Sequence, residues 1–104
     1  MRRWMARGAL VVLMAGTATA TEGPTVAMGK TLFESTVLGS NGKSCAGCHP
    51  GGAGLAEIGA YDEETLKEMI NFCIRDALAG NMFAPDSQEL DSLHLYLRSL
   101  PQEK

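Results

Sequence analysis

The chain has 104 residues, 45% of them hydrophobic and 20% charged, which fits one globular domain and excludes a disordered or membrane-spanning protein. Its formal net charge is −3, from 9 Lys and Arg against 12 Asp and Glu. Because nucleic-acid-binding domains carry a clustered basic surface, this balance excludes nucleic acid as a partner.

The first 20 residues have the features of an export signal. Arginines lie at positions 2, 3 and 7, residues 8–16 form a short apolar run, and Ala18-Thr19-Ala20 matches the small-x-small pattern before a cleavage point. The apolar run is far below the roughly 18–20 residues that a spanning helix needs. We therefore predict a cleaved signal peptide over residues 1–20, export to the periplasm or an equivalent compartment, and a domain over residues 21–104 with no membrane span.

The first helix is predicted from Thr25 to about Val37, with Gly29 and Phe33 on or near one face. Glycine in a helix interior costs about 1 kcal/mol relative to alanine, so we expect a close helix crossing at Gly29. A glycine-rich turn over residues 38–43 follows this helix.

The pattern that carries the chemistry comes next. Cys45-Ala46-Gly47-Cys48-His49 is C-x-x-C-H, the attachment signature of c-type haem. A thioredoxin-like pair does not require the adjacent histidine, and a zinc site lacks a second ligand pair. We predict one covalent haem c, attached through Cys45 and Cys48, with His49 as the proximal iron ligand. The glycine-rich loop over residues 50–59 is expected to wrap a haem edge.

Two more helices are predicted after this loop. One begins after Asp62, a favourable N-cap, and ends at Gly80. The other runs from the Ser87 cap through Leu100, and Pro101 ends it. The first of these has one apolar face at helical spacing, made of Leu66, Met69, Ile70, Cys73 and Ala77. These elements predict an all-α chain.

The sixth iron position has several candidates among the residues. Cys73 lies on the apolar face of its helix, where it is either a ligand or a small buried side chain. Met82 has the expected thioether, Met69 lies one turn before Cys73, and His94 offers an imidazole. The residues alone leave these four, and an open position, as alternatives.

Two resemblances bear on fold and ligation. The helix with Gly29 and Phe33, the CAGCH motif and the helix with Leu93, Tyr96 and Leu97 look like a small class I cytochrome c over about residues 25–100. This likeness implies a cytochrome c-like all-α fold wrapped around one covalently bound haem. It also implies that the first and last helices cross at a glycine–aromatic contact.

The second resemblance is narrower. The run Ile70-Asn71-Phe72-Cys73 and the segments after it are similar to the haem domains of thiosulfate dehydrogenases and SoxA proteins, and to the small NaxL/NaxS-type mono-haem cytochromes. In those proteins a cysteine in this helix is the distal haem ligand, which implies that role for Cys73. The usual class I pattern has an axial methionine in a late loop, which leaves Met82 as the alternative.

The resemblances imply a function. A cysteine thiolate donates charge to ferric iron and lowers its reduction potential, so we expect a low-potential cytochrome that carries single electrons to or from a redox partner protein. The alternatives are a haem protein that binds or senses NO or CO, and the haem subunit of a sulfur-compound oxidoreductase. The sequence has no second haem motif and no convergent acid–base groups, so we do not expect an enzyme. The likeness to paired small cytochromes implies a homo- or heterodimer.

Overall fold

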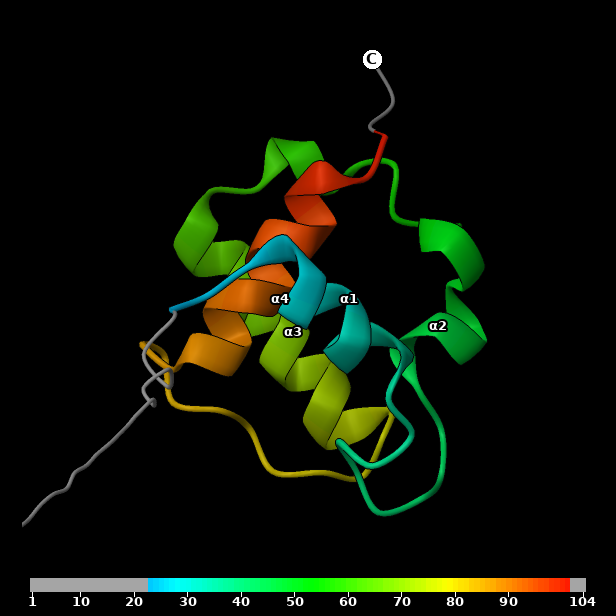
Figure 1. The fold of residues 1–104 in the computed structure, drawn as a ribbon. Coiled ribbons are helices and arrows are strands. Elements are labelled where there is room, and N and C mark those ends of the chain that lie inside the picture. The colour runs from blue at the N-terminus through cyan, green and yellow to red at the C-terminus, as the bar shows by residue number, and fades with distance from the viewer. Residues whose placement is uncertain (1–22, 102–104) are drawn as a thin grey trace, which may run out of the picture.

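The computed structural model describes residues 23–101, so the predicted signal peptide over residues 1–20 lies outside the described residues. Within the described range the chain is helical and holds no β-strand, in agreement with the all-α prediction (Figure 1). Its elements, in chain order, are α1 Val26–Glu34, α2 Cys45–Cys48, η2 Pro50–Gly52, η3 Ile58–Ala60, α3 Glu63–Asp76 and α4 Gln88–Ser99.

Helix α1 begins where predicted but ends early. The Thr25 side chain caps it by accepting a hydrogen bond from the Met28 N–H at 2.9 Å. The predicted end near Val37 is wrong, because the backbone of Ser35 turns extended with ψ at 139°. The Ser35 hydroxyl then accepts from the Val37 N–H at 3.1 Å, a local side-chain bond that competes with continued helix.

Helices α1 and α4 cross at Gly29, as predicted. A Cβ atom added there would lie 2.0 Å from the Ser92 carbonyl oxygen, so only glycine permits this approach. Next to the crossing, the rings of Phe33 and Tyr96 pack with their centroids 5.1 Å apart and their planes inclined by 54°. This contact joins the first and the last helix of the described chain.

Helix α3 is capped by Asp62, whose carboxylate accepts from the Thr65 N–H at 2.8 Å. We predicted that Gly80 would stop this helix, but α3 ends at Asp76 and the left-handed residue after it is Ala79, with φ at +57°. Gly80 instead allows the backbone after α3 to lie close to the backbone at Leu38, since a Cβ at Gly80 would lie 2.5 Å from the Leu38 carbonyl oxygen. Helix α4 agrees with its prediction to within one residue.

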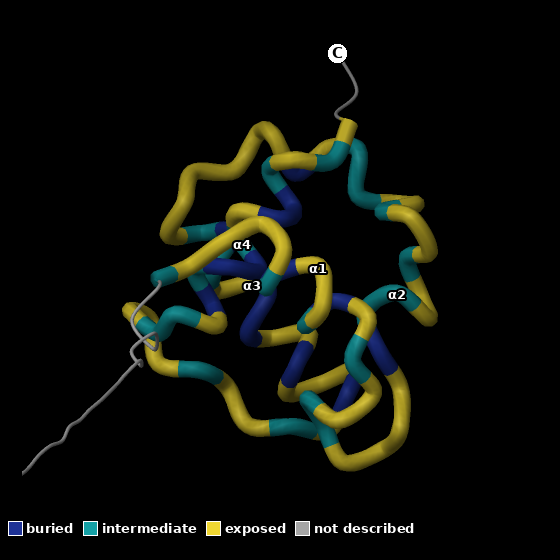
Figure 2. Tube along the Cα trace, in the orientation of Figure 1, coloured by how far each residue is buried: buried dark blue, intermediate teal, exposed yellow. Residues whose placement is uncertain are grey.

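The core lies where α1, α3 and α4 face one another (Figure 2). Its buried side chains are Phe33, Ile58, Leu66, Ile70, Ile74, Leu78, Leu90, Leu93, Tyr96 and Leu97. Among residues 23–101, every helix is too short or too polar to cross a bilayer.

Candidate functional site

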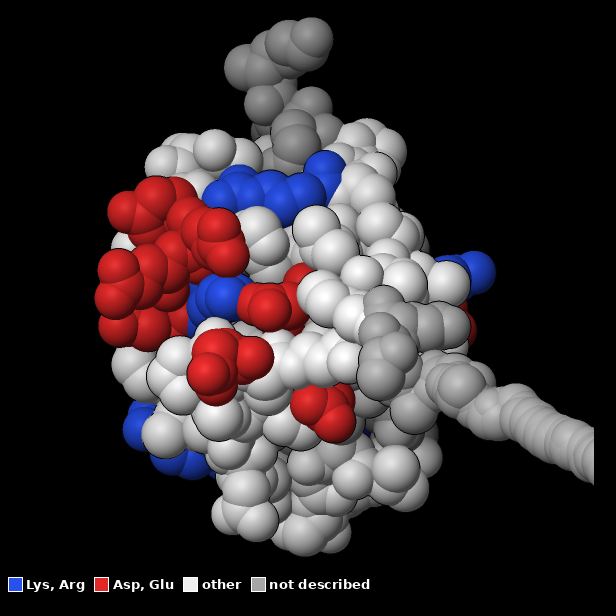
Figure 3. Space-filling view, turned by 60° about the vertical axis from the view of Figure 1, so that its left-hand side comes forward, with Lys and Arg blue, Asp and Glu red and all other residues white. Residues whose placement is uncertain are grey.

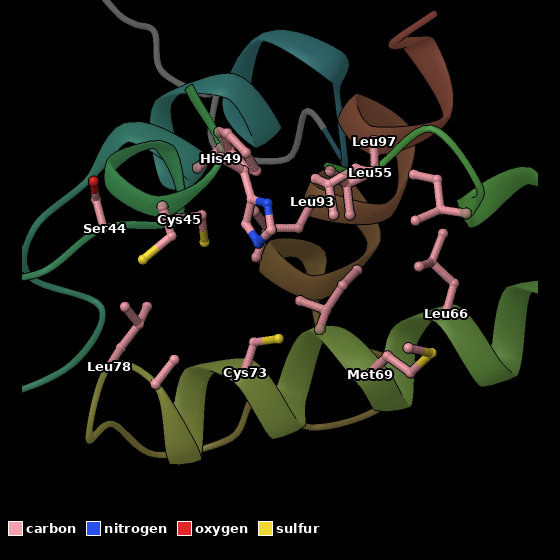
Figure 4. A pocket seen from close by; sticks show the side chains of 15 residues that line it. Ser44, Cys45, His49, Leu55, Leu66, Met69, Cys73, Leu78, Leu93 and Leu97 are labelled. Carbon is pink, nitrogen blue, oxygen red and sulfur yellow. The ribbon is translucent and has the colours of Figure 1, made fainter. Parts of the chain in front are cut away.

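An open cleft separates the CAGCH motif from helix α3 (Figure 4). Its empty volume, including the part open to solvent, is about 730 Å³. The whole predicted apolar face of α3 lines it. The lining residues are Phe33, Ser44, Cys45, Cys48, His49, Leu55, Ile58, Leu66, Met69, Ile70, Cys73, Ala77, Leu78, Leu93 and Leu97. The cleft is therefore hydrophobic apart from its sulfur groups, one imidazole and one hydroxyl.

The motif cysteines are brought to the cleft by the single helical turn α2. Buried Ser44 caps this turn, because its hydroxyl accepts from the Gly47 N–H at 2.9 Å. Positions three apart lie on one side of a helix, so Cys45 and Cys48 both line the cleft. Burial raises the pKa of the Cys45 thiol, and the neighbouring Cys73 adds to the effect. By stabilising the helical turn α2, the Ser44 cap holds the two motif thiols on the same side of it.

His49 is oriented by a backbone carbonyl. Its Nδ1 lies 2.8 Å from the Ala53 carbonyl oxygen, and because a carbonyl only accepts, Nδ1 carries the proton. The neutral ring then has its lone pair on Nε2. Metal-binding histidines are commonly held in this way, with the other ring nitrogen donating to a carbonyl. Figure 4 shows the His49 ring pointing into the cleft.

Cys73 faces the cleft from the opposite wall. In Figure 4 its side chain rises from α3 toward the wall that carries His49, and Met69 lies one turn away on the same helix. Burial raises the pKa of the Cys73 thiol, and the charges of Asp76 and Cys48 raise it further. The thiol is therefore protonated near neutral pH unless a cation stabilises the thiolate, as a bound metal does.

The other two candidate ligands do not line the cleft. Met82, the alternative ligand, lies outside it. His94 also lies outside it, and its Nε2 accepts a hydrogen bond from Arg98 at 3.2 Å. Of the four candidates, the structure brings Cys73 and Met69 to the same cleft as His49.

Asn71 explains the position of Met82. Its amide donates to the Phe83 carbonyl at 2.9 Å and accepts from the Phe83 N–H at 2.9 Å. Asn71 precedes Cys73 by two positions, roughly 200° around the helix, so this bond pair holds the Met82–Phe83 segment on the far side of α3. Sequence reasoning missed this role, although a lone amide within the apolar run INFC was a signal for it.

Acidic side chains gather on one flank of the molecule, around a basic group (Figure 3). Lys67 lies among them, with its ammonium 3.2 Å from Glu63 and also paired with Asp91 of α4. It donates to the Pro85 carbonyl at 3.3 Å as well. The hydrogen bond with Asp91 is the main cause that raises the pKa of Lys67. These contacts join α3, α4 and the segment between them, which is a structural role.

The residues around the cleft fit a haem better than a bare ion. In the described part of the chain, no three His, Cys, Asp or Glu side chains lie close enough together to hold a metal ion. A covalently attached haem c instead needs a hydrophobic cleft, two thiols at one wall and an imidazole with a free Nε2, and the cleft has all of these. Comparisons with protein-family models, curated proteins and solved structures find no match.

Proposed function

We propose that this chain is a periplasmic mono-haem c-type cytochrome, with a class I cytochrome c-like fold, that carries single electrons. The observation that carries the proposal is the CAGCH motif at the edge of a hydrophobic cleft, with a further thiol on the opposite wall. When bound, the haem supplies one-electron chemistry at its iron, and the protein tunes the potential through ligands and burial.

Three motif residues have roles in holding the haem. Cys45 and Cys48 form its thioether bonds, which their common side of α2 supports. His49 binds the iron through Nε2. The hydrogen bond from Nδ1 to the Ala53 carbonyl supports this role, because it selects the ligating tautomer and limits rotation of the ring.

Cys73 is the distal ligand in this proposal. Its place on the cleft-lining face of α3 and the position of Met82 outside the cleft both support it. A thiolate ligand stabilises ferric iron, so the expected potential is low. The hydrophobic walls favour an electron carrier over substrate chemistry, because their one basic side chain is His49, which is assigned to the iron, and they present no carboxylate to a substrate. The reaction partner is then another redox protein.

The test of haem attachment is the intact mass of the exported protein. It should exceed the mass of the processed chain by one haem, and the haem should resist extraction by acid acetone. Haem that extracts, or protein that exports and folds without haem, contradicts the proposal.

The test of ligation is electron paramagnetic resonance of the ferric protein. We expect a low-spin thiolate signal that Cys73→Ser abolishes, with haem still attached and the potential raised. Met82→Ala is the matched control and should leave the signal unchanged. A signal that survives Cys73→Ser rules out Cys73 as the ligand. A shift of the Soret band when CO is added to the reduced wild-type protein favours the gas-binding alternative.

A further inference from the structure

Arg98 hydrogen-bonds one wall of the cleft to helix α4. Arg98, in the last turn of α4, donates to the Ile58 carbonyl at 3.1 Å and to the Tyr61 carbonyl at 2.5 Å. Its remaining nitrogen, Nε, donates to Nε2 of His94 at 3.2 Å. The planar fork of arginine thus joins the two ends of the η3 turn to α4.

The fastened segment shapes the cleft. Leu55 and Ile58 line the cleft, and Ile58 is almost fully buried. The backbone hydrogen bonds in this segment are local turns, such as Ile58 N–H to the Leu55 carbonyl at 3.3 Å and Tyr61 N–H to the Ile58 carbonyl at 3.1 Å. Local turns do not fix the position of the segment relative to α4. The Arg98 bonds do so, together with the burial of Ile58 in the same core cluster as Leu93 and Leu97 of α4.

The third bond of Arg98 requires a neutral His94. Protonation removes the Nε2 lone pair that accepts from Arg98 and puts a second positive charge beside the guanidinium. Burial lowers the pKa of His94 and Arg98 lowers it further, so the neutral form is favoured near pH 7. The charged groups that act on His94 are Glu63 and Lys67 of α3 and Asp91 and Arg98 of α4, two of each sign. The carboxylate of Asp62, the N-cap of α3, interacts with Arg98 itself.

We propose that His94 and Arg98 form a pH-sensitive clamp on the cleft wall. Neutral His94 keeps the guanidinium on the Ile58 and Tyr61 carbonyls, whereas acidification charges His94, repels Arg98 and loosens residues 55–61. Arg98 is thus a positioning residue for the wall. The effect of the clamp on a haem rests on the proposed function, but the clamp itself does not.

Hydrogen exchange followed by mass spectrometry tests the clamp in the purified full-length protein. Amide exchange in residues 55–61, relative to α3 amides and corrected for intrinsic rates, should rise as the pH falls through the titration of His94. By linkage, the exchange rate should rise about tenfold for each unit by which the pKa of His94 in the open clamp exceeds its pKa in the closed clamp. The rate of deuterium uptake at the imidazole C2 atom of His94, followed against pH, gives the pKa of His94 in the same samples.

Three variants complete the experiment. His94→Gln keeps a neutral acceptor at every pH, so the pH dependence should disappear while the wall stays protected. Arg98→Lys cannot span both carbonyls, so residues 55–61 should exchange faster than in the wild type at every pH. Lys30→Gln, an exposed charge change on α1, is the control and should behave as wild type. A relative exchange rate that does not change with pH, or one that changes equally in His94→Gln, overturns the clamp.

The haem-loaded protein adds a separate outcome. Its reduction potential should vary with pH over the His94 titration in the wild type and not in His94→Gln. Because amide exchange and the His94 titration need no haem, a chain without haem contradicts the proposed function and leaves the test of the clamp intact.

Discussion

Replacing Gly29 by alanine tests the helix crossing, because two physical effects predict opposite signs. In a helix interior alanine is favoured over glycine by about 1 kcal/mol. At the contact of α1 with α4, however, the new Cβ would lie 2.0 Å from the Ser92 carbonyl oxygen and 2.6 Å from the Tyr96 Cβ. The carbonyl belongs to the α4 backbone and cannot rotate away, so the overlap is relieved only when the helices separate.

The expected magnitude follows from these two effects. Overpacking costs about 1–3 kcal/mol, and a clash with backbone places Gly29→Ala at the upper end of that range. After the gain in helix propensity is subtracted, unfolding should be easier by about 2 kcal/mol. In a domain of this size each kcal/mol lowers the Tm by roughly 4–8 °C, so we expect a fall of about 8–16 °C.

The assay is thermal and urea unfolding followed by circular dichroism. Lys30→Gly and Lys30→Ala, at the exposed neighbouring position, are the matched controls for helix propensity alone. Their difference should reproduce the propensity term of about 1 kcal/mol in favour of alanine. If Gly29→Ala is as stable as the wild type or more stable, the close crossing of α1 and α4 is refuted.

Two more predictions follow from polar contacts of α3. Asn71→Ala should destabilise the protein by about 1–3 kcal/mol in urea unfolding, because the Phe83 N–H and carbonyl lose their partner, and an unchanged midpoint would argue against this anchor. The pKa of Lys67 is raised by its carboxylate partners, so the stability from this lysine is present below its ordinary pKa of 10.5 and lost as the pH rises through the raised value. Lys67→Met should therefore reduce the alkaline loss of stability in a pH series of urea midpoints; the same alkaline slope in both proteins would contradict it.

Signals within short stretches of the sequence predicted the helices and the apolar face that lines the cleft. The side chains of Asp62 and Ser87 cap α3 and α4 where expected, because a cap needs only a partner two or three residues away. The helical period placed the apolar face of α3, and that face lines the cleft. The crossing at Gly29 was also predictable, because glycine destabilises a helix interior relative to alanine and is expected there where a close approach excludes a side chain.

Contacts between residues distant in sequence decided the rest. The bonds of Asn71 to Phe83 keep Met82 away from the cleft, and the bonds of Arg98 to the carbonyls of Ile58 and Tyr61 hold the cleft wall. In each case a side chain meets a backbone group 12 to 40 residues away. Periodicity and capping carry no information at that separation, because the partners come together only after the helices have packed.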